Sequence, residues 1–141
     1  MTDWDPETWT RNLIADMRAH GGRPSSGPMA GRPLGILTTK GARTGEDRVA
    51  IVTYHREGDA LVIVASKSGE DVHPAWYHNL VANPEATIEV DNEVIPVVAR
   101  EATGADRDRL YDDHARIRPE FAEYPKITKR VIPVLLLERA G

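Results

Sequence analysis

The sequence predicts a mainly β protein with added helices (α+β), built as a small β-barrel of about six antiparallel strands with helices packed outside. Six short runs are rich in apolar and β-branched residues, short polar turns join two pairs of them, and helical segments come between the later runs. Such runs joined as hairpins are typical of small barrels. The expected strands are 34–39, 49–55, 60–66, 86–90, 94–100 and 131–138.

Residues 1–33 precede the first strand and are expected to form a helix followed by a mobile arm. Pro6 suits the first turn of a helix over 6–20. Its apolar side chains share one side at helical spacing: Trp9, Leu13 and Met17 or Ile14. The arm, GGRPSSGPMAGRP at 21–33, is dense in Gly, Pro and Ser, and we expect it to fold over a ligand. Too few residues precede it for a second core, so 1–141 is expected to be a single domain.

The remaining elements follow from turn residues and periodicity. REGD at 56–59 and DNE at 91–93 are short, polar and contain turn-formers, so each is expected to close a hairpin between antiparallel strands. HPAWYHNLVANP at 73–84 is expected to be a helix between the third and fourth strands. Residues 104–124 are expected to hold one or two more helices before the last strand.

Composition narrows the classes of function. The net charge of -4 and the pI near 5.7 argue against a general nucleic-acid binder, which needs a broad basic face. Zero cysteines exclude disulfides, thiolate metal sites and cysteine nucleophiles. No apolar run approaches the ~18 residues of a membrane span, and the acidic N-terminus is unlike a signal peptide. We therefore expect a cytoplasmic protein without a transmembrane segment.

Positive charge is concentrated around one glycine-bracketed turn, LTTKGARTGEDR at 37–48. Such a turn exposes backbone N–H groups, and with nearby cations it suits a phosphate or carboxylate. The turn is not a P-loop. A P-loop has four residues between its glycines and is followed by Lys-Ser/Thr and a helix, whereas Gly41 and Gly45 enclose three residues and a strand follows. A solubilising hairpin tip remains the alternative. The candidate ligand-binding residues are Lys40, Arg43, Thr44, Gly45 and Arg48.

A second candidate region is VASKSGEDVHPAWYHNL at 64–80. A strand ends in the small residues of 65–67, which let a flat ring approach the backbone, and a helix then begins near Pro74. Trp76 offers an apolar wall to such a ring. Core packing is the alternative role for Trp76 and Tyr77.

No metal site is expected from the histidines. His73 and His78 are five positions apart, a spacing that does not place both rings on one helical face. His55 and His114 have no carboxylate at metal-ligand spacing. A Gly-x-Ser-x-Gly nucleophile elbow is also missing from the sequence.

Three motifs together, LTTKGARTGEDR, VASKSGEDVHPAWYHNLVANPEATIEV and EYPKITKRVIPVLLLER, resemble the deazaflavin-dependent nitroreductase family, from about residue 21 to 139. The resemblance implies a split β-barrel and coenzyme F420, a deazaflavin with a phosphate and an oligoglutamate tail. The positions that match those holding the phosphate and tail lie in the basic turn: Lys40, Arg43, Thr44, Gly45 and Arg48. Those expected beside the ring are Ala65, Ser66, Lys67 and Trp76.

The same resemblance implies an enzyme that transfers a hydride from reduced F420 to a small-molecule acceptor, with the protein setting distance and orientation. The candidate catalytic residues are Ser66 and Tyr124, the latter as a hydrogen-bond donor to a developing oxyanion. The chain is poor in tyrosine and has Ala42-Arg43-Thr44 where Arg-Lys-Ser is common in the family. A quinone or an activated alkene (enone) is therefore at least as plausible an acceptor as a nitro compound.

Two other functions stay open at this point. One is an FMN-binding reductase on the same fold, although FMN is less expected than F420 because only F420 adds several carboxylates for the basic turn. The other is a non-catalytic protein that binds F420 without turnover. A homodimer and a peripheral membrane contact also stay open.

Overall fold

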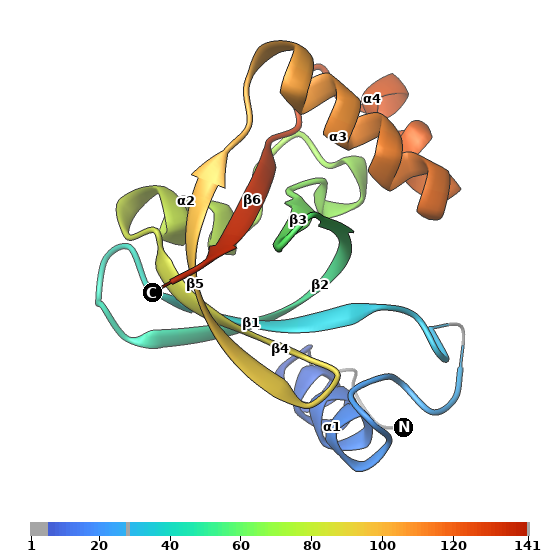
Figure 1. Cartoon of the computed structure of the whole chain (residues 1–141), viewed down its shortest axis with the longest axis vertical. Coiled ribbons are helices and arrows are strands. Elements are labelled where there is room, and N and C mark those ends of the chain that lie inside the picture. The colour runs from blue at the N-terminus through green and yellow to red at the C-terminus, as the bar shows by residue number, and fades with distance from the viewer. Residues whose placement is uncertain (1–5, 28, 141) are drawn as a thin grey trace.

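The computed structural model describes residues 6–27 and 29–140. Six antiparallel strands close into a barrel in the order β1-β2-β3-β6-β5-β4 (Figure 1). The predicted mainly β, six-stranded barrel with added helices is therefore confirmed. The strands are β1 Leu34–Lys40, β2 Asp47–Glu57, β3 Ala60–Val64, β4 Glu85–Val90, β5 Glu93–Glu101 and β6 Val134–Arg139.

Tight turns join β2 to β3 and β4 to β5, as the sequence predicts. In the second turn, Val90 pairs with Glu93, and the two residues between them, Asp91 and Asn92, have φ of 50° and 66°. A type I′ hairpin turn requires positive φ at both of these positions, which Asn and Asp tolerate better than most residues. β6 pairs with both β3 and β5, and this closes the barrel.

The helices lie outside the barrel (Figure 1). One helix precedes β1, two helical segments lie between β3 and β4, and three lie between β5 and β6. In chain order they are α1 Pro6–Ala19, the short 3-10 helix η1 Lys67–Gly69, α2 Ala75–Ala82, α3 Gly104–Ile117, the 3-10 helix η2 Pro119–Ala122 and α4 Tyr124–Ile127.

Two apolar clusters follow from the alternation of side chains along β3. Leu61 and Ile63 point into the barrel, where they pack with residues of the other strands. Val62 and Val64 point outward and pack beneath α3 and η2, against residues such as Leu110. Because α3 covers this outer face, β3 is buried on both sides.

A third cluster attaches α1 to the barrel. Met17 is fully buried against Leu34 and Ile36, while Leu13 and Ile14 are partly buried. Trp9, which the sequence places on the same side, stays 45% exposed, because the packing involves the later turns of the helix.

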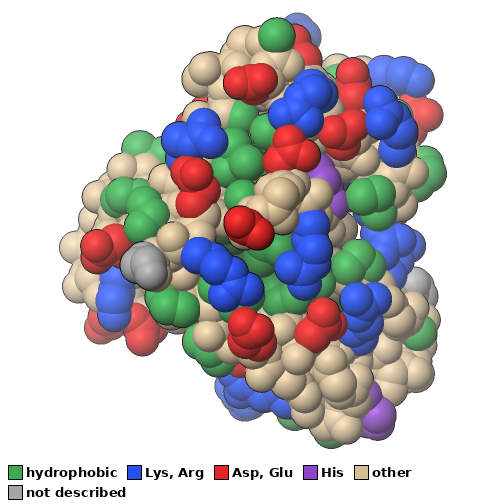
Figure 2. Space-filling view, in the orientation of Figure 1, with side chains coloured by type: hydrophobic (Ala, Val, Ile, Leu, Met, Phe, Trp, Pro, Cys, Tyr) green, Lys and Arg blue, Asp and Glu red, His purple; other side chains and the backbone are tan. Residues whose placement is uncertain are grey.

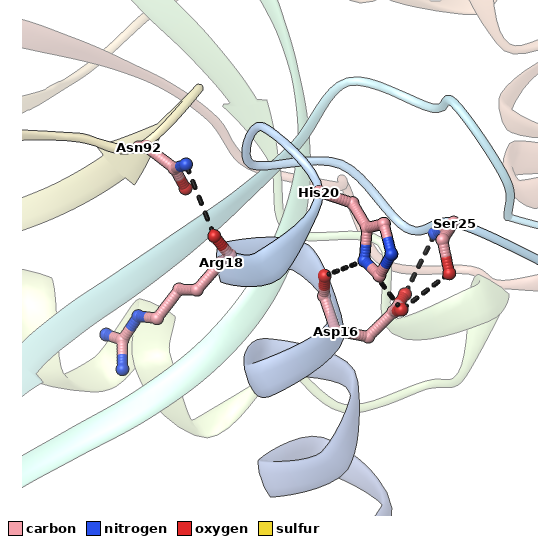
Figure 3. A network of polar contacts seen from close by, with 5 residues as sticks. All are labelled: Asp16, Arg18, His20, Ser25 and Asn92. Atoms are coloured by element: carbon pink, nitrogen blue, oxygen red, sulfur yellow. Dashed lines mark hydrogen bonds and ion pairs between the residues drawn. The ribbon is translucent and has the colours of Figure 1, made fainter.

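Polar contacts tie α1 to the following arm and to the β4–β5 turn (Figure 3). Asp16 accepts hydrogen bonds from the backbone N–H and hydroxyl of Ser25, at 2.8 and 2.5 Å. Asn92 donates its side-chain amide to the carbonyl oxygen of Arg18 at 3.3 Å. The mobility expected of the 21–33 arm stays a prediction, and residues 1–5 and 28 lie outside the described residues.

Candidate functional site

A cavity of about 710 Å³ opens between the β1–β2 turn, residues 41–46, and α2. We call it the turn cavity. The β1–β2 turn and the start of β2 line it with Arg43, Thr44 and Arg48, and α2 lines it with Ala75, Trp76 and Asn79. One wall is thus cationic and hydroxyl-bearing, whereas the α2 wall is apolar at Ala75 and Trp76 and polar at His78 and Asn79.

Backbone hydrogen bonds close the turn into a defined shape. Gly41 donates to the carbonyl of Glu46 at 2.7 Å, and Gly45 donates to the carbonyl of Gly41 at 2.9 Å. Gly45 has φ of +71°, a conformation that glycine adopts without steric cost. The hydroxyl of Thr44 accepts from the N–H of Glu46 at 3.2 Å. The turn therefore presents Arg43 near its tip from a constrained backbone.

Asn79 fastens this turn to α2, and sequence reasoning missed it. The side chain is buried; its Oδ1 accepts from the N–H of Ala42 at 2.9 Å, and its Nδ2 donates to the Thr39 hydroxyl at 3.0 Å. Asn79 stands within the quoted HPAWYHNL motif, but its partners lie 37 and 40 positions earlier in the chain. Only the folded structure brings these groups together.

The predicted cations of the turn differ in how they are placed. Arg43 has no ion-pair partner among the described residues and lines the cavity, whereas Arg48 lines it while contacting Glu46 at 3.3 Å. Lys40 forms an ion pair with Asp47 outside the lining of the turn cavity. Gly45 does not line it either. The structure thus brings together Arg43, Thr44, Arg48 and Trp76 of the predicted set.

Elsewhere on the surface, cations and acids interleave. Figure 2 shows Lys and Arg side chains alternating with Asp and Glu over one face of the molecule. Ion pairs of this kind include Arg100 with Glu138 at 2.9 Å and Arg109 with Glu57 at 2.7 Å. Arg43, unpaired among the described residues and at a cavity, differs from these locally balanced charges.

Trp76 also lines a second cavity, of about 340 Å³. We call it the arm cavity, because Met29 and Arg32 of the 21–33 arm line it. The predicted residues Ser66, Lys67, Trp76 and Tyr124 all line it, together with Phe121. Ala65 does not: it is fully buried, packs in the barrel core and donates its N–H to the carbonyl of Pro133 at 2.9 Å.

Aromatic rings form one wall of the arm cavity. The rings of Phe121 and Tyr124 meet edge to face, with centroids 5.1 Å apart. Across the rim, Arg32 of the arm lies 3.7 Å from Glu120 of η2. The arm and the η2–α4 segment therefore enclose the same space from two sides.

A buried histidine pair supports this aromatic wall from behind. The ring of His114 lies 4.4 Å from that of Phe121, and its Nδ1 is 2.8 Å from Nδ1 of His55. Burial lowers the pKa of His114 to about 3 and also lowers that of His55, so both rings are neutral at pH 7, and one Nδ1 donates to the other. No local pattern predicts this pair, because its members are 59 positions apart in the chain.

Tyr77, the other aromatic residue of the α2 motif, lies outside the lining of both cavities. Its hydroxyl donates to Glu101 at 2.7 Å, and burial, together with this hydrogen bond, raises the pKa of Tyr77 to about 12. Among the described residues, no group of three or more His, Asp or Glu side chains is placed to hold a metal ion. Over the same part of the chain, every helix is too short or too polar to cross a membrane.

The fold is a closed antiparallel split barrel, and Trp76 lines both its cationic cavity and its aromatic cavity. A family model described as F420H(2)-dependent quinone reductase matches residues 9–139. The chain belongs to this family of oxidoreductases. The resemblance to F420-dependent split-barrel enzymes is therefore confirmed.

Individual relatives agree with this assignment. The F420H(2)-dependent quinone reductase of Mycobacterium tuberculosis strain H37Rv is 40% identical over 113 residues, which cover 76% of this chain and 74% of the relative. A solved F420-H2 dependent reductase is 36% identical, with a TM-score of 0.70, and covers 76% of this chain and 95% of its own. A solved structure titled a domain-swapped dimer is 32% identical to this chain, with a TM-score of 0.73. The match covers 95% of this chain and 100% of the other.

Proposed function

We propose that this protein reduces quinones with F420H2, holding the cofactor in the turn cavity with its ring near Trp76 and the quinone in the arm cavity. The observation that supports the proposal is that Trp76 lines both cavities, so a cationic turn and a space walled by aromatic rings adjoin at one side chain. The family match and the named relatives support the same chemistry.

The residues of the turn cavity fit F420. Arg43, Arg48 and the Thr44 hydroxyl suit a phosphate and carboxylates, because charge-assisted hydrogen bonds to such groups are strong. The apolar wall of Ala75 and Trp76 suits an aromatic ring system. Bound reduced F420 supplies the hydride, and the protein supplies position and exclusion of water.

The residues of the arm cavity fit a quinone. Met29 and Phe121 offer apolar surface to a flat ring, and the Tyr124 hydroxyl has no hydrogen-bond partner among the described residues. That hydroxyl is thus free to donate to a quinone oxygen as negative charge develops there. The contact between Arg32 and Glu120 narrows the rim and helps to keep water out. Enones and nitro compounds share the flat shape and are secondary candidates.

The test is cofactor binding followed by a survey of acceptors. Calorimetric titration with F420 and with FMN at two salt concentrations should show tighter binding of F420 and a stronger dependence on salt. Oxidation of F420H2 is then followed with menadione, an enone and a nitroimidazole, and menadione should react fastest. Tighter binding of FMN would favour the FMN reductase, whereas F420 binding without turnover of any acceptor would favour a non-catalytic binder.

We also propose that the chain forms a homodimer. A 32% identical structure that covers 95% of this chain is titled a domain-swapped dimer. In the present structure α1 packs on the barrel mainly through Met17, Leu13 and Ile14 and continues into the Gly- and Pro-rich arm, so α1 is the element best able to exchange between copies. Light scattering after size-exclusion chromatography should give twice the 15.6 kDa chain mass.

A further inference from the structure

Arg118 connects α3 to η2 and carries a guanidinium without a hydrogen-bond partner. Its N–H donates to the carbonyl of His114 at 2.9 Å, and its carbonyl accepts from the N–H of Phe121 at 3.0 Å, so its backbone is held on both sides. The side-chain Nε is buried and unsatisfied among the described residues. Buried donors of this kind are rare in native proteins, and a guanidinium keeps its positive charge. Arg118 is therefore an unpartnered cation at a fixed place in the fold.

Two charged neighbours show where this guanidinium lies. Burial lowers the pKa of Arg118, the charge of Arg32 lowers it further, and the charge of Glu120 opposes this decrease. Arg32 and Glu120 both line the arm cavity, so Arg118 lies close to that cavity although it is not part of the lining. The Nη1 of Arg32 is 3.7 Å from Oε2 of Glu120, which is too long for a hydrogen bond. One carboxylate thus serves two guanidiniums and satisfies neither.

The balance of charge at the arm cavity differs from that of the surrounding surface. The charged residues of its lining are Arg32, Lys67 and Glu120, so with Arg118 three cations share one carboxylate. By contrast, Arg100 lies 2.9 Å from a carboxylate that serves it directly. A local excess of positive charge beside partly apolar walls attracts an anion that also has an apolar body.

We infer that Arg32 and Arg118 bind an anionic substituent of the acceptor, so that the arm cavity favours quinones that carry a carboxylate or sulfonate over neutral ones. Guanidiniums hold such groups through strong, often bidentate hydrogen bonds. The inference rests on the proposed function, which places the quinone ring in this cavity, and it adds the chemical class of the acceptor.

The carboxylates of the F420 tail are a second source of the same chemistry. We assign the site to the acceptor because Arg32 and Glu120 share the arm cavity with the rings of Phe121 and Tyr124, whereas the turn cavity has cations of its own. Titration of F420 with and without an anionic probe separates the two sources. A probe that binds beside the acceptor leaves the Kd for F420 unchanged, whereas a probe that raises it competes with the cofactor and overturns the assignment.

The binding test uses two probes that differ by one charge, naphthalene-2-sulfonate and naphthalene-2-sulfonamide. Calorimetry is done on the wild-type protein saturated with oxidised F420, so that the cations of the turn cavity are occupied. The sulfonate should bind about tenfold or more tightly than the sulfonamide, as expected for one charge-assisted contact, and added salt should weaken the sulfonate alone. Equal affinities for the two probes would overturn the inference.

Variants test whether Arg32 and Arg118 cause the preference. Arg32→Gln and Arg118→Gln should each reduce the ratio of the two affinities, whereas Glu120→Gln should increase it, because that variant removes the competing carboxylate. Arg116→Gln is the matched control, since Arg116 is an exposed cation of α3 that pairs with Asp113 at 2.8 Å and lines neither cavity. A lower Tm of Arg118→Gln with an unchanged affinity ratio would make Arg118 a structural residue and contradict the inference.

A kinetic test separates failure of the inference from failure of the proposed function. Oxidation of F420H2 is followed with 1,2-naphthoquinone and with its 4-sulfonate, and the ratio of their KM values is compared between the wild type and Arg118→Gln. The comparison of ratios cancels the difference in intrinsic reactivity of the two quinones. Turnover of both quinones with the same ratio in both proteins overturns the inference alone. Turnover of neither overturns the proposed function, and the acceptor assignment with it.

Discussion

Acidification from pH 8 to pH 5 is expected to destabilise the fold through His114. Burial lowers the pKa of this ring from 6.5 to about 3, so at pH 5 the unfolded chain binds a proton there and the native protein does not. Because the unfolded state binds more protons, the free energy of unfolding rises with pH. The stabilisation is fully present above pH 6.5 and is lost as the pH falls toward 3.

The loss of stability depends on how far the pH lies below 6.5, the pKa of the histidine in the unfolded chain. Each unit contributes ~1.4 kcal/mol per group, so His114 alone lowers the free energy of unfolding by about 2 kcal/mol at pH 5. For a domain of this size that corresponds to a decrease of roughly 5–10 °C in Tm. The pKa of His55 is also lowered by burial, which adds to the decrease in the wild-type protein.

Urea unfolding followed by tryptophan fluorescence at pH 8 and pH 5 measures this quantity. His114→Gln keeps a polar partner for His55 but does not titrate, so its loss of stability between the two pH values should be smaller than that of the wild type by about 2 kcal/mol. An undiminished pH dependence in His114→Gln would refute the reasoning, because another group would then be responsible.

Three further predictions concern the two cavities. Arg43→Ala should raise the Kd for F420 about tenfold or more, since a charge-assisted contact contributes roughly 1.5–3 kcal/mol. An unchanged affinity in calorimetry would show that the turn is only a solubilising hairpin tip. Tyr124→Phe should lower kcat with menadione about 10- to 100-fold in steady-state assays with little change in F420 affinity, so loss of F420 binding would contradict its placement. Asn79→Leu removes the hydrogen bonds that hold the turn to α2, so it should raise the Kd for F420 in the same titration while the KM for menadione stays near the wild-type value. A raised KM for menadione with an unchanged Kd for F420 would contradict the role of Asn79 in cofactor binding.

The sequence was most informative where the signal is local. Strand runs, the Asp91–Asn92 turn and the glycine-bracketed turn depend on neighbouring residues, and all of them form, although the last strand begins at Val134 and not at the expected residue 131. The first strand was expected to end at residue 39, but it continues to Lys40. Side chains alternate between the two faces of a strand, so the Lys40 side chain lies on the face opposite that of Thr39. Thr39 lines the turn cavity, whereas Lys40 does not.

Residues that depend on distant partners were missed. Asn79 is a polar side chain within a quoted motif, but its role comes from groups 37 and 40 positions away. The histidine pair is separated by 59 positions, and no periodicity links its members. Local pattern predicts which segments surround a site, whereas the groups that hold those segments together become visible only after chain closure.

The position of β6 between β3 and β5 has a consequence for synthesis on the ribosome. Until Val134–Arg139 emerges, the first five strands can form only an open sheet, and the edges of β3 and β5 are both unpaired. One late segment then fills both edges and, a few residues earlier, delivers Arg130, which donates to the carbonyl oxygens of Ala65 and Ser66 in the loop after β3. Nascent chains that stall before residue 130 should therefore be prone to aggregate and unable to assemble the arm cavity wall, because contacts of such high sequence separation form late in folding.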